Sequence, residues 1–164
     1  MAETQRRFAT MGTSVFKVVD KLINNQRLCR LLKYQARNPF SDEYEDVDGL
    51  ELLQKQILVT PKIYDESTEL MSYLSFCYSD YSINPLNDSF KTAHIRFDIA
   101  CPYKEWVLDN SSLRPYLIME EIDKTFNGTR LAGMGVMTFE RVEALVLTPQ
   151  IMGYSMRYKI DEFN

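Results

Sequence analysis

His94 is the only histidine of this 164-residue chain, and it is therefore the first residue to consider for acid–base chemistry. A catalytic histidine is commonly oriented by a carboxylate, and Asp98 lies four positions further along the same predicted strand. Two such positions on one face of a strand are about 13 Å apart, at roughly 3.3 Å per residue. This separation is too long for a direct contact between the side chains. We therefore expect His94 to be a surface residue and the chain not to be an enzyme.

The other patterns that could bind a metal or a cofactor are incomplete. Residues 41–49 (SDEYEDVDG) are acidic, but they lack the ligand spacing, the central glycine and the closing glutamate of a calcium loop. Gly133 and Gly135 lack the surrounding glycine spacing of a dinucleotide-binding or phosphate-binding loop. The three cysteines are an odd number, and none lies close to another in the sequence. We expect free thiols, no metal site and no cofactor.

The apolar spacing predicts one α+β domain in residues 13–164, after a flexible arm in residues 1–12. Helices are expected in residues 15–23, 26–34 and 114–127, where apolar residues recur on one helical face. Pro115 suits the first turn of the third helix, and Asn127-Gly128 suits its end. Small polar residues predict the three N-caps, which are Thr13 or Ser14, then Asn25, then Ser111 or Ser112.

The clearest strand signal is the alternation of apolar and polar residues in 92–101. Its apolar face holds Ile95, Phe97, Ile99 and Cys101, and its polar face holds His94, Arg96 and Asp98. Further β segments are expected in residues 57–63, 70–78, 134–139, 142–147 and 152–160, and a long exposed loop in 79–91. The predicted fold class is α+β, with a small, mainly antiparallel sheet packed against two or three helices and a strand-helix-strand-strand C-terminal half.

Charge is distributed unevenly along the chain, whose formal net charge is −4. Residues 1–37 hold eight Lys or Arg against two acids, whereas residues 38–70 hold nine acids against two lysines. This polarity suits head-to-tail contacts between copies, and it equally suits a basic helix packed on its own acidic loop. The candidate inter-subunit contacts are Arg27, Arg30, Lys33, Arg37, Asp42, Glu43, Glu45, Asp46 and Asp48.

Three segments follow one another in a pattern that goes beyond the single elements. Residues 16–39 (FKVVDKLINNQRLCRLLKYQARNP) lead through DVDG into ILVTPKI. The strand IRFDIAC at 95–101 is followed by Trp106 and by the helix LRPYLIMEEIDKTFNG at 113–128. The closing pair LVLTPQIMGYSMRYKI at 145–160 passes through a short turn. In this order the segments resemble the tail-terminator and tail-to-head joining (neck) proteins of tailed bacteriophages.

The resemblance implies a structural virion protein that forms a ring, usually of six copies, at the head-proximal end of the tail tube. Such a ring terminates tube polymerisation and joins the tail to the neck. The implied partners are further copies of the chain, the tail tube protein, a neck or connector protein, and double-stranded DNA that passes non-specifically through the lumen. The implied location is the tail or neck of the virion, after assembly in the host cytoplasm and without a membrane. The candidate loops for tube or neck contacts contain Tyr81, Asn84, Asn87, Asp88, Thr129 and Arg130.

Other functions stay open from the sequence. Within the same class, the chain could be a head-completion or stopper protein of the connector. From different classes, it could be a small monomeric adaptor that holds an acidic partner, or a small enzyme that uses His94 with a nearby carboxylate. Binding to assembled tubes, self-association and the effect of His94→Ala on any turnover distinguish these alternatives.

Overall fold

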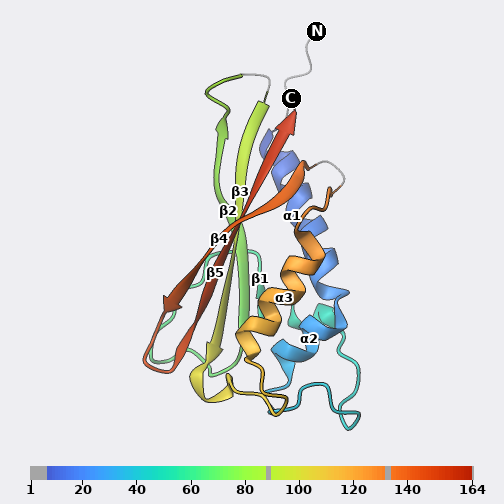
Figure 1. The fold of residues 1–164 in the computed structure, drawn as a ribbon, viewed down its shortest axis with the longest axis vertical. Coiled ribbons are helices and arrows are strands. Elements are labelled where there is room, and N and C mark those ends of the chain that lie inside the picture. The colour runs from blue at the N-terminus through green and yellow to red at the C-terminus, as the bar shows by residue number, and fades with distance from the viewer. Residues whose placement is uncertain (1–6, 88–89, 132–133, 164) are drawn as a thin grey trace.

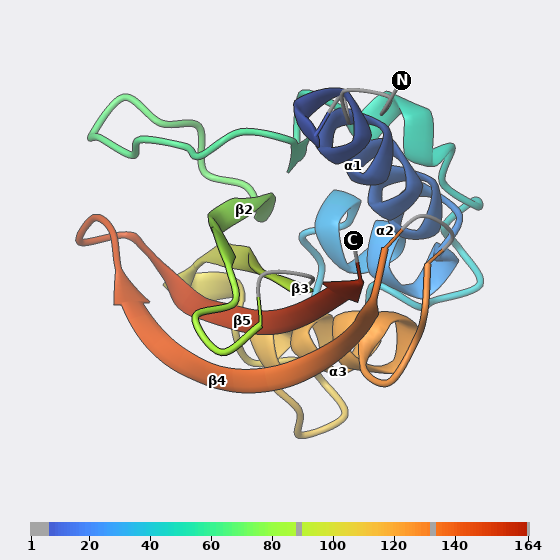
Figure 2. The same cartoon turned by 90° about the horizontal axis from the view of Figure 1, so that it is seen from above.

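The computed structural model describes residues 7–87, 90–131 and 134–163. Five strands form one sheet in the order β1-β2-β3-β5-β4, and all neighbours are antiparallel except β1 and β2. Figure 1 shows the three α-helices gathered on one side of this sheet, and Figure 2 shows the strong curvature of the strands. The elements are α1 (Arg7–Ile23), α2 (Gln26–Lys33), β1 (Ile57–Leu58), β2 (Tyr73–Ile83), β3 (Phe90–Pro102), α3 (Arg114–Phe126), β4 (Val136–Val146) and β5 (Ile151–Phe163). The predicted α+β class and the order of the C-terminal elements are confirmed.

The core lies between the sheet and the helices, and β3 runs through its centre. The side chains of β3 alternate between buried and half-buried from Phe90 to Ile99, as the sequence pattern predicts. Phe97 packs at 5.7 Å from the ring of Phe76 on β2 and at 5.2 Å from the ring of Phe126 on α3. Tyr158 on β5 meets the same ring edge-on at 5.8 Å. These contacts hold α3 over the middle of the sheet.

The helix starts were predicted with mixed success. Asn25 is the N-cap of α2, and its side chain accepts a hydrogen bond from the backbone N–H of Leu28. The predicted cap at Thr13 or Ser14 is wrong, because α1 already begins at Arg7 and both hydroxyls bond to carbonyls one turn earlier in the helix. Residues 1–6 of the predicted arm lie outside the described residues.

The third helix also starts differently from the prediction. Its N-cap is Leu113, which makes no side-chain capping bond, and Ser112 bonds to Asn110 instead. Pro115 does lie in the first turn, because the missing N–H has no helical partner there. The helix ends before Gly128, whose φ of +71° is the left-handed value that glycine adopts readily.

The strand boundaries correct the sequence prediction in three places. The predicted loop 79–91 is mostly strand, because β2 continues to Ile83 and β3 starts at Phe90. The two predicted segments 134–139 and 142–147 form the single strand β4. The segment 57–63 shrinks to Ile57–Leu58, since Pro61 has no N–H to donate to a ladder.

Candidate functional site

Two β-bulges lie on either side of the central strands β3 and β5. In β2 the register against β3 shifts between Tyr78 and Asp80, and in β4 the register against β5 shifts between Phe139 and Arg141. Each bulge inserts one extra residue, so the side chains beyond it change face. As a result Asp80 and Glu140 point to the face of the sheet that carries no helices, which we call the open face.

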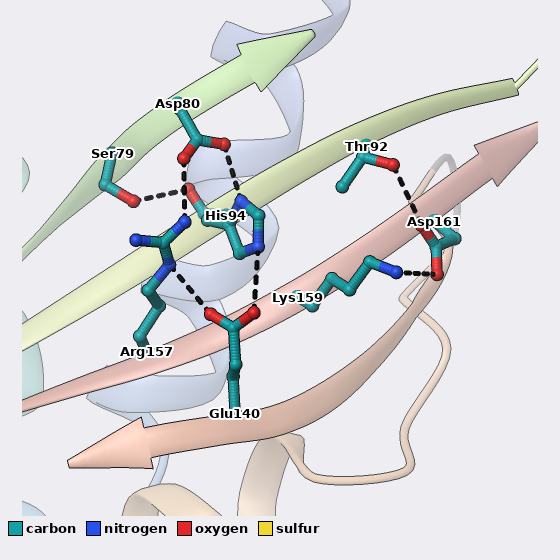
Figure 3. A network of polar contacts seen from close by, with 8 residues as sticks. All are labelled: Ser79, Asp80, Thr92, His94, Glu140, Arg157, Lys159 and Asp161. Atoms are coloured by element: carbon teal, nitrogen blue, oxygen red, sulfur yellow. Dashed lines mark hydrogen bonds and ion pairs between the residues drawn. The ribbon is translucent and has the colours of Figure 1, made fainter. Parts of the chain in front are cut away.

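Asp80 and Glu140 converge there on His94 and Arg157 (Figure 3). The Nδ1 atom of His94 lies 2.5 Å from Oδ1 of Asp80, and its Nε2 atom lies 3.4 Å from Oε1 of Glu140. Arg157 donates to Oδ2 of Asp80 at 2.8 Å and lies 2.9 Å from Oε2 of Glu140. The side chain of His94 is only 12% exposed within this group. We call these four residues the His94 cluster.

The His94 cluster does not have the geometry of an acid–base site. Both ring nitrogens of His94 are in contact with carboxylates, so neither is directed at a bound molecule. Asp98, the carboxylate that the sequence suggested, accepts hydrogen bonds from Arg96 and Ser155 instead. No group of three or more metal-ligating side chains occurs in residues 7–87, 90–131 and 134–163. The arrangement joins four strands electrostatically.

Sequence reasoning missed both acidic partners of His94. Asp80 was placed in a loop and Glu140 between two β segments, because a bulge breaks the alternation on which strand prediction depends. Only the strand register brings residues 80, 94, 140 and 157 together. Within the sequence, the break in alternation between two long β-favouring runs was the available signal.

Three further ion pairs lie on the open face. Arg96 lies 3.0 Å from Asp98, and further pairs join Arg141 to Glu143 at 3.5 Å and Lys159 to Asp161 at 3.1 Å. A shallow hollow beside them is lined partly by Lys62, whose Nζ lies 4.7 Å from the ring centroid of Tyr73. Positive and negative side chains therefore alternate over this face.

The basic residues of α2 and the acidic loop contact each other within one chain. Arg30 donates to the backbone carbonyl of Tyr44, and the ring of Tyr44 stacks on Tyr34 at 4.3 Å. Lys33 pairs with Glu51 at 3.1 Å. Asp48 accepts from the N–H of Leu50 and caps the short 3₁₀ helix Gly49–Leu52.

The other basic and acidic residues predicted as inter-subunit contacts do not take part in these contacts between α2 and the acidic loop. Arg27 pairs with the buried Glu121 of α3 at 3.0 Å, and Arg37 pairs with Asp109 at 3.2 Å. Glu121 is buried beneath Arg27 although it is a charged residue. The four remaining carboxylates of the acidic loop are exposed, and they belong to Asp42, Glu43, Glu45 and Asp46.

The predicted tube-contact and neck-contact residues are split between strand and turn. Tyr81 is half-buried in β2 and packs against the core, so its assignment to an exposed loop is wrong. Asn84 and Asn87 lie in the turn after β2, and Asp88 lies outside the described residues. Thr129 and Arg130 follow α3 and precede β4.

An apolar hollow lies between α3 and β4 on the helix side of the sheet. Its floor is formed by Tyr116, Met119, Phe139, Val142 and Met156. Its acidic rim is formed by Glu120 and Asp123. The bulge in β4 places Phe139 and Val142 on the same face although they are three residues apart. We call this feature the α3–β4 groove.

Comparison with known proteins gives the chain a family. No curated protein matches it, and none of the described helices is long and apolar enough to cross a membrane. A family model described as YomW matches residues 25–160, which run from the N-cap of α2 through most of β5. The name is of the style given to SPbeta-prophage proteins. The chain therefore belongs to the YomW family and is a phage-associated protein.

Proposed function

We propose that the chain is a structural protein of a tailed phage that forms a ring at the head-proximal end of the tail tube. In this proposal the ring terminates tube polymerisation, joins the tail to the neck and lets DNA pass through its lumen. Family membership supports the association with phages, and the resemblance of the three sequence segments supports the position in the tail.

The observation that carries the proposal is the edge strand β4, whose outer edge bonds to residues 127–130 only as far as Phe139 and meets no other described strand from Glu140 to Val146. It is eleven residues long, and within the described residues no strand pairs with its outer edge. Val136, Phe139, Val142 and Val146 of this strand are exposed. Long edge strands with exposed apolar side chains invite pairing with other chains, so natural monomers usually cover or charge them. A subunit that is completed by its neighbours explains why β4 remains open.

The charge pattern of the open face is compatible with a DNA channel. Phosphate binding requires lysine or arginine side chains that can release counterions from DNA. On the open face Arg96, Arg141, Arg157 and Lys159 each have a carboxylate partner within 3.5 Å. We propose that this face lines the lumen, where neutralised cations let DNA slide without being held.

The first experiment is to determine the native mass of the purified protein together with negative-stain images. A closed ring of about six copies supports the proposal. The second is to polymerise purified tail tube protein with and without the chain. Shorter tubes that carry the protein at one end support termination, whereas binding to the portal-side connector alone supports the stopper function. A strict monomer that binds neither assembly contradicts both functions.

Charge reversal tests whether the acidic loop contacts a neighbour. Asp46→Lys is the suitable variant because Asp46 is exposed, whereas Arg30 holds the backbone of its own chain and its reversal would destabilise the subunit. Glu66→Lys is the matched control, since Glu66 is exposed in a different loop. Loss of the ring with Asp46→Lys alone assigns the acidic loop to the subunit interface. If both variants form rings, the acidic loop is not part of the subunit interface, and the proposed function is unaffected.

A further inference from the structure

We infer that the α3–β4 groove binds helix α1 of a second copy of the chain, an inference that rests on the proposed ring. The occupant is α1 through its exposed side chains, which include Phe8 and Phe16. The contact would be heterologous, since the groove and α1 are different surfaces of one subunit.

The α3–β4 groove is a wide-open, mostly apolar hollow. It lies between α3 on one side and β4 on the other, and its floor is apolar. Val142 is 44% exposed and Phe139 is 39% exposed, although the ring of Phe139 meets Tyr158 edge-on at 5.8 Å. Amphipathic helices bind such grooves through apolar residues one to two turns apart.

Helix α1 carries two phenylalanine side chains that its own chain leaves exposed. Val18, Val19 and Leu22 are buried against the core, as expected for the inner side of an amphipathic helix. Phe8 and Phe16 are nevertheless 82% and 65% exposed on the same helix. Fully burying a phenylalanine removes about 150–250 Å² of surface from water, so two exposed rings mark a surface suited to contact.

The helices of one chain leave part of the helix side of β4 uncovered. Helix α3 covers β3 and β5 through Phe126 and its neighbours, while the helix-side face of β4 beyond Met137 is exposed. A helix of a second copy lying beside α3 would cover Phe139 and Val142. The layer would then extend over all of β4 with the same helix-on-sheet packing that the chain uses elsewhere.

The charges of the two surfaces are complementary. Glu120 and Asp123 line the groove, and the lining contains no Lys or Arg. Glu120 pairs with Lys124 of α3, and Asp123 accepts from Tyr158, yet both carboxylates remain at the rim. Helix α1 holds three basic residues, among them the exposed Lys21, against the single acid Asp20. A basic amphipathic helix suits an acidic apolar groove better than a helix of opposite charge.

The positions of the two surfaces allow a closed assembly. Figure 2 shows α1 at the top of the view and most of β4 along the bottom. When α1 of each copy enters the α3–β4 groove of the next, the contact repeats with one rotation, and it closes into a ring if that rotation divides a full turn. An isologous dimer would instead require each surface to meet itself.

Disulfide trapping tests the contact directly. The test mixes two variants that each carry one new cysteine, Phe16→Cys in one chain and Val142→Cys in the other, each with Cys77→Ser. The native Cys29 and Cys101 stay in place because both are buried. The control replaces Val142→Cys with Ile63→Cys, since Ile63 is 90% exposed in a loop outside the groove. We expect a disulfide-linked heterodimer from the first mixture and at most a trace from the control.

A second pair of variants tests the energetics without a covalent bond. Val142→Glu places a carboxylate in the acidic groove, and we expect it to dissociate the ring, while Ile63→Glu should leave the ring intact. Circular dichroism and thermal unfolding of each variant confirm that the subunit is folded. Should Val142→Glu unfold the subunit, the cross-linking result decides.

The outcomes separate this inference from the proposed function. Rings or capped tubes that yield no Phe16–Val142 cross-link overturn the α1 contact and leave the proposed function intact. Equal cross-linking in the control mixture also overturns it, as does a mixture of the Phe16→Cys and Val142→Cys variants that gives no cross-link at its highest soluble concentration. A selective cross-link in a protein that does not cap tubes supports the α1 contact and contradicts tail termination.

Discussion

His94 and Asp80 face each other across β3 and β2, with 2.5 Å between Nδ1 and Oδ1. The same carboxylate accepts from Arg157 of β5, and Glu140 of β4 approaches both His94 and Arg157. The His94 cluster therefore links β2, β3, β5 and β4 at the level of the two bulges. Bulges strengthen the local twist, so a polar cluster located there stabilises the sheet where it curves most.

We predict that His94→Ala lowers the free energy of unfolding by about 1–2 kcal/mol, because two hydrogen-bonded contacts of a half-buried side chain are lost. Urea unfolding measures this change, and Asp80→Asn combined with His94→Ala forms a double-mutant cycle. Since the two residues are in direct contact, the cycle should give a coupling energy of about 0.5 kcal/mol or more. Additive effects would contradict the contact. Native mass should be unchanged, because the role of His94 is structural.

We predict a larger loss of stability for Arg114→Met. Arg114 is fully buried and donates to the backbone carbonyls of Leu31, Tyr34, Ala36 and Glu105, which ties the first turn of α3 to the end of α2. Removing the guanidinium leaves several buried carbonyls without donors, at a cost of about 3 kcal/mol or more. Arg114→Lys should lose much of the same stability, since an ammonium lacks the planar fork. Arg130→Met, at an exposed position, is the control and should change stability by less than about 0.5 kcal/mol.

The sequence is sufficient for elements whose pattern is local. The alternation around Phe97 and the apolar stripe of α3 are each set by a few neighbouring residues, and both were predicted correctly. The two bulges could not be predicted, because one inserted residue reverses the face of every side chain beyond it. Asp80 and Glu140 therefore went unrecognised as partners of His94.

Burial of charged residues is the second feature that the sequence did not reveal. Arg114 and Glu121 are of residue types that usually occupy solvent-exposed helix positions. Both are nevertheless buried, where they bond to partners about 80–95 residues away in the sequence. Such contacts depend on how α2 packs against α3, and no local pattern records that packing. The α3–β4 groove was missed for the same reason, since it joins a helix to a strand across a turn.

Two glycines give a third prediction, in which one alanine substitution destabilises the protein and the other stabilises it. A Cβ atom at Gly153 would overlap the backbone carbonyl of Ile99 on the neighbouring strand, so Gly153→Ala should destabilise the sheet by about 1–3 kcal/mol. Gly12 lies in α1 with open space around the corresponding position, so Gly12→Ala should stabilise by about 0.5–1 kcal/mol. Thermal unfolding of the two variants measures both effects. A stable Gly153→Ala protein would mean that β3 and β5 are further apart than described.

Thiol labelling gives the fourth prediction. Burial raises the pKa of all three thiols, to about 11 for Cys29 and to about 12 for Cys101, but only Cys77, half-buried on β2, is accessible to a reagent. Only the thiolate reacts readily, so Cys77 should be the single cysteine of the native protein that is labelled quickly at pH 8. Cys77→Ser should abolish the fast phase, and urea should expose the other two thiols. Fast labelling of Cys29 or Cys101 in the native protein would contradict their burial.

The same two thiols predict how stability changes at alkaline pH. A cysteine has an ordinary pKa of 9.0, and folding raises the pKa of Cys29 and Cys101, so the folded state binds more protons than the unfolded state above pH 9. Their contribution to stability is fully present below pH 9 and is lost as the pH rises toward about 11 to 12. Urea unfolding at pH 8 and pH 10 should therefore show a decrease, and Cys101→Ala should reduce the size of that decrease. An equal decrease in the wild type and in Cys101→Ala would assign the alkaline loss to other groups, such as Tyr158, whose pKa is also raised by burial.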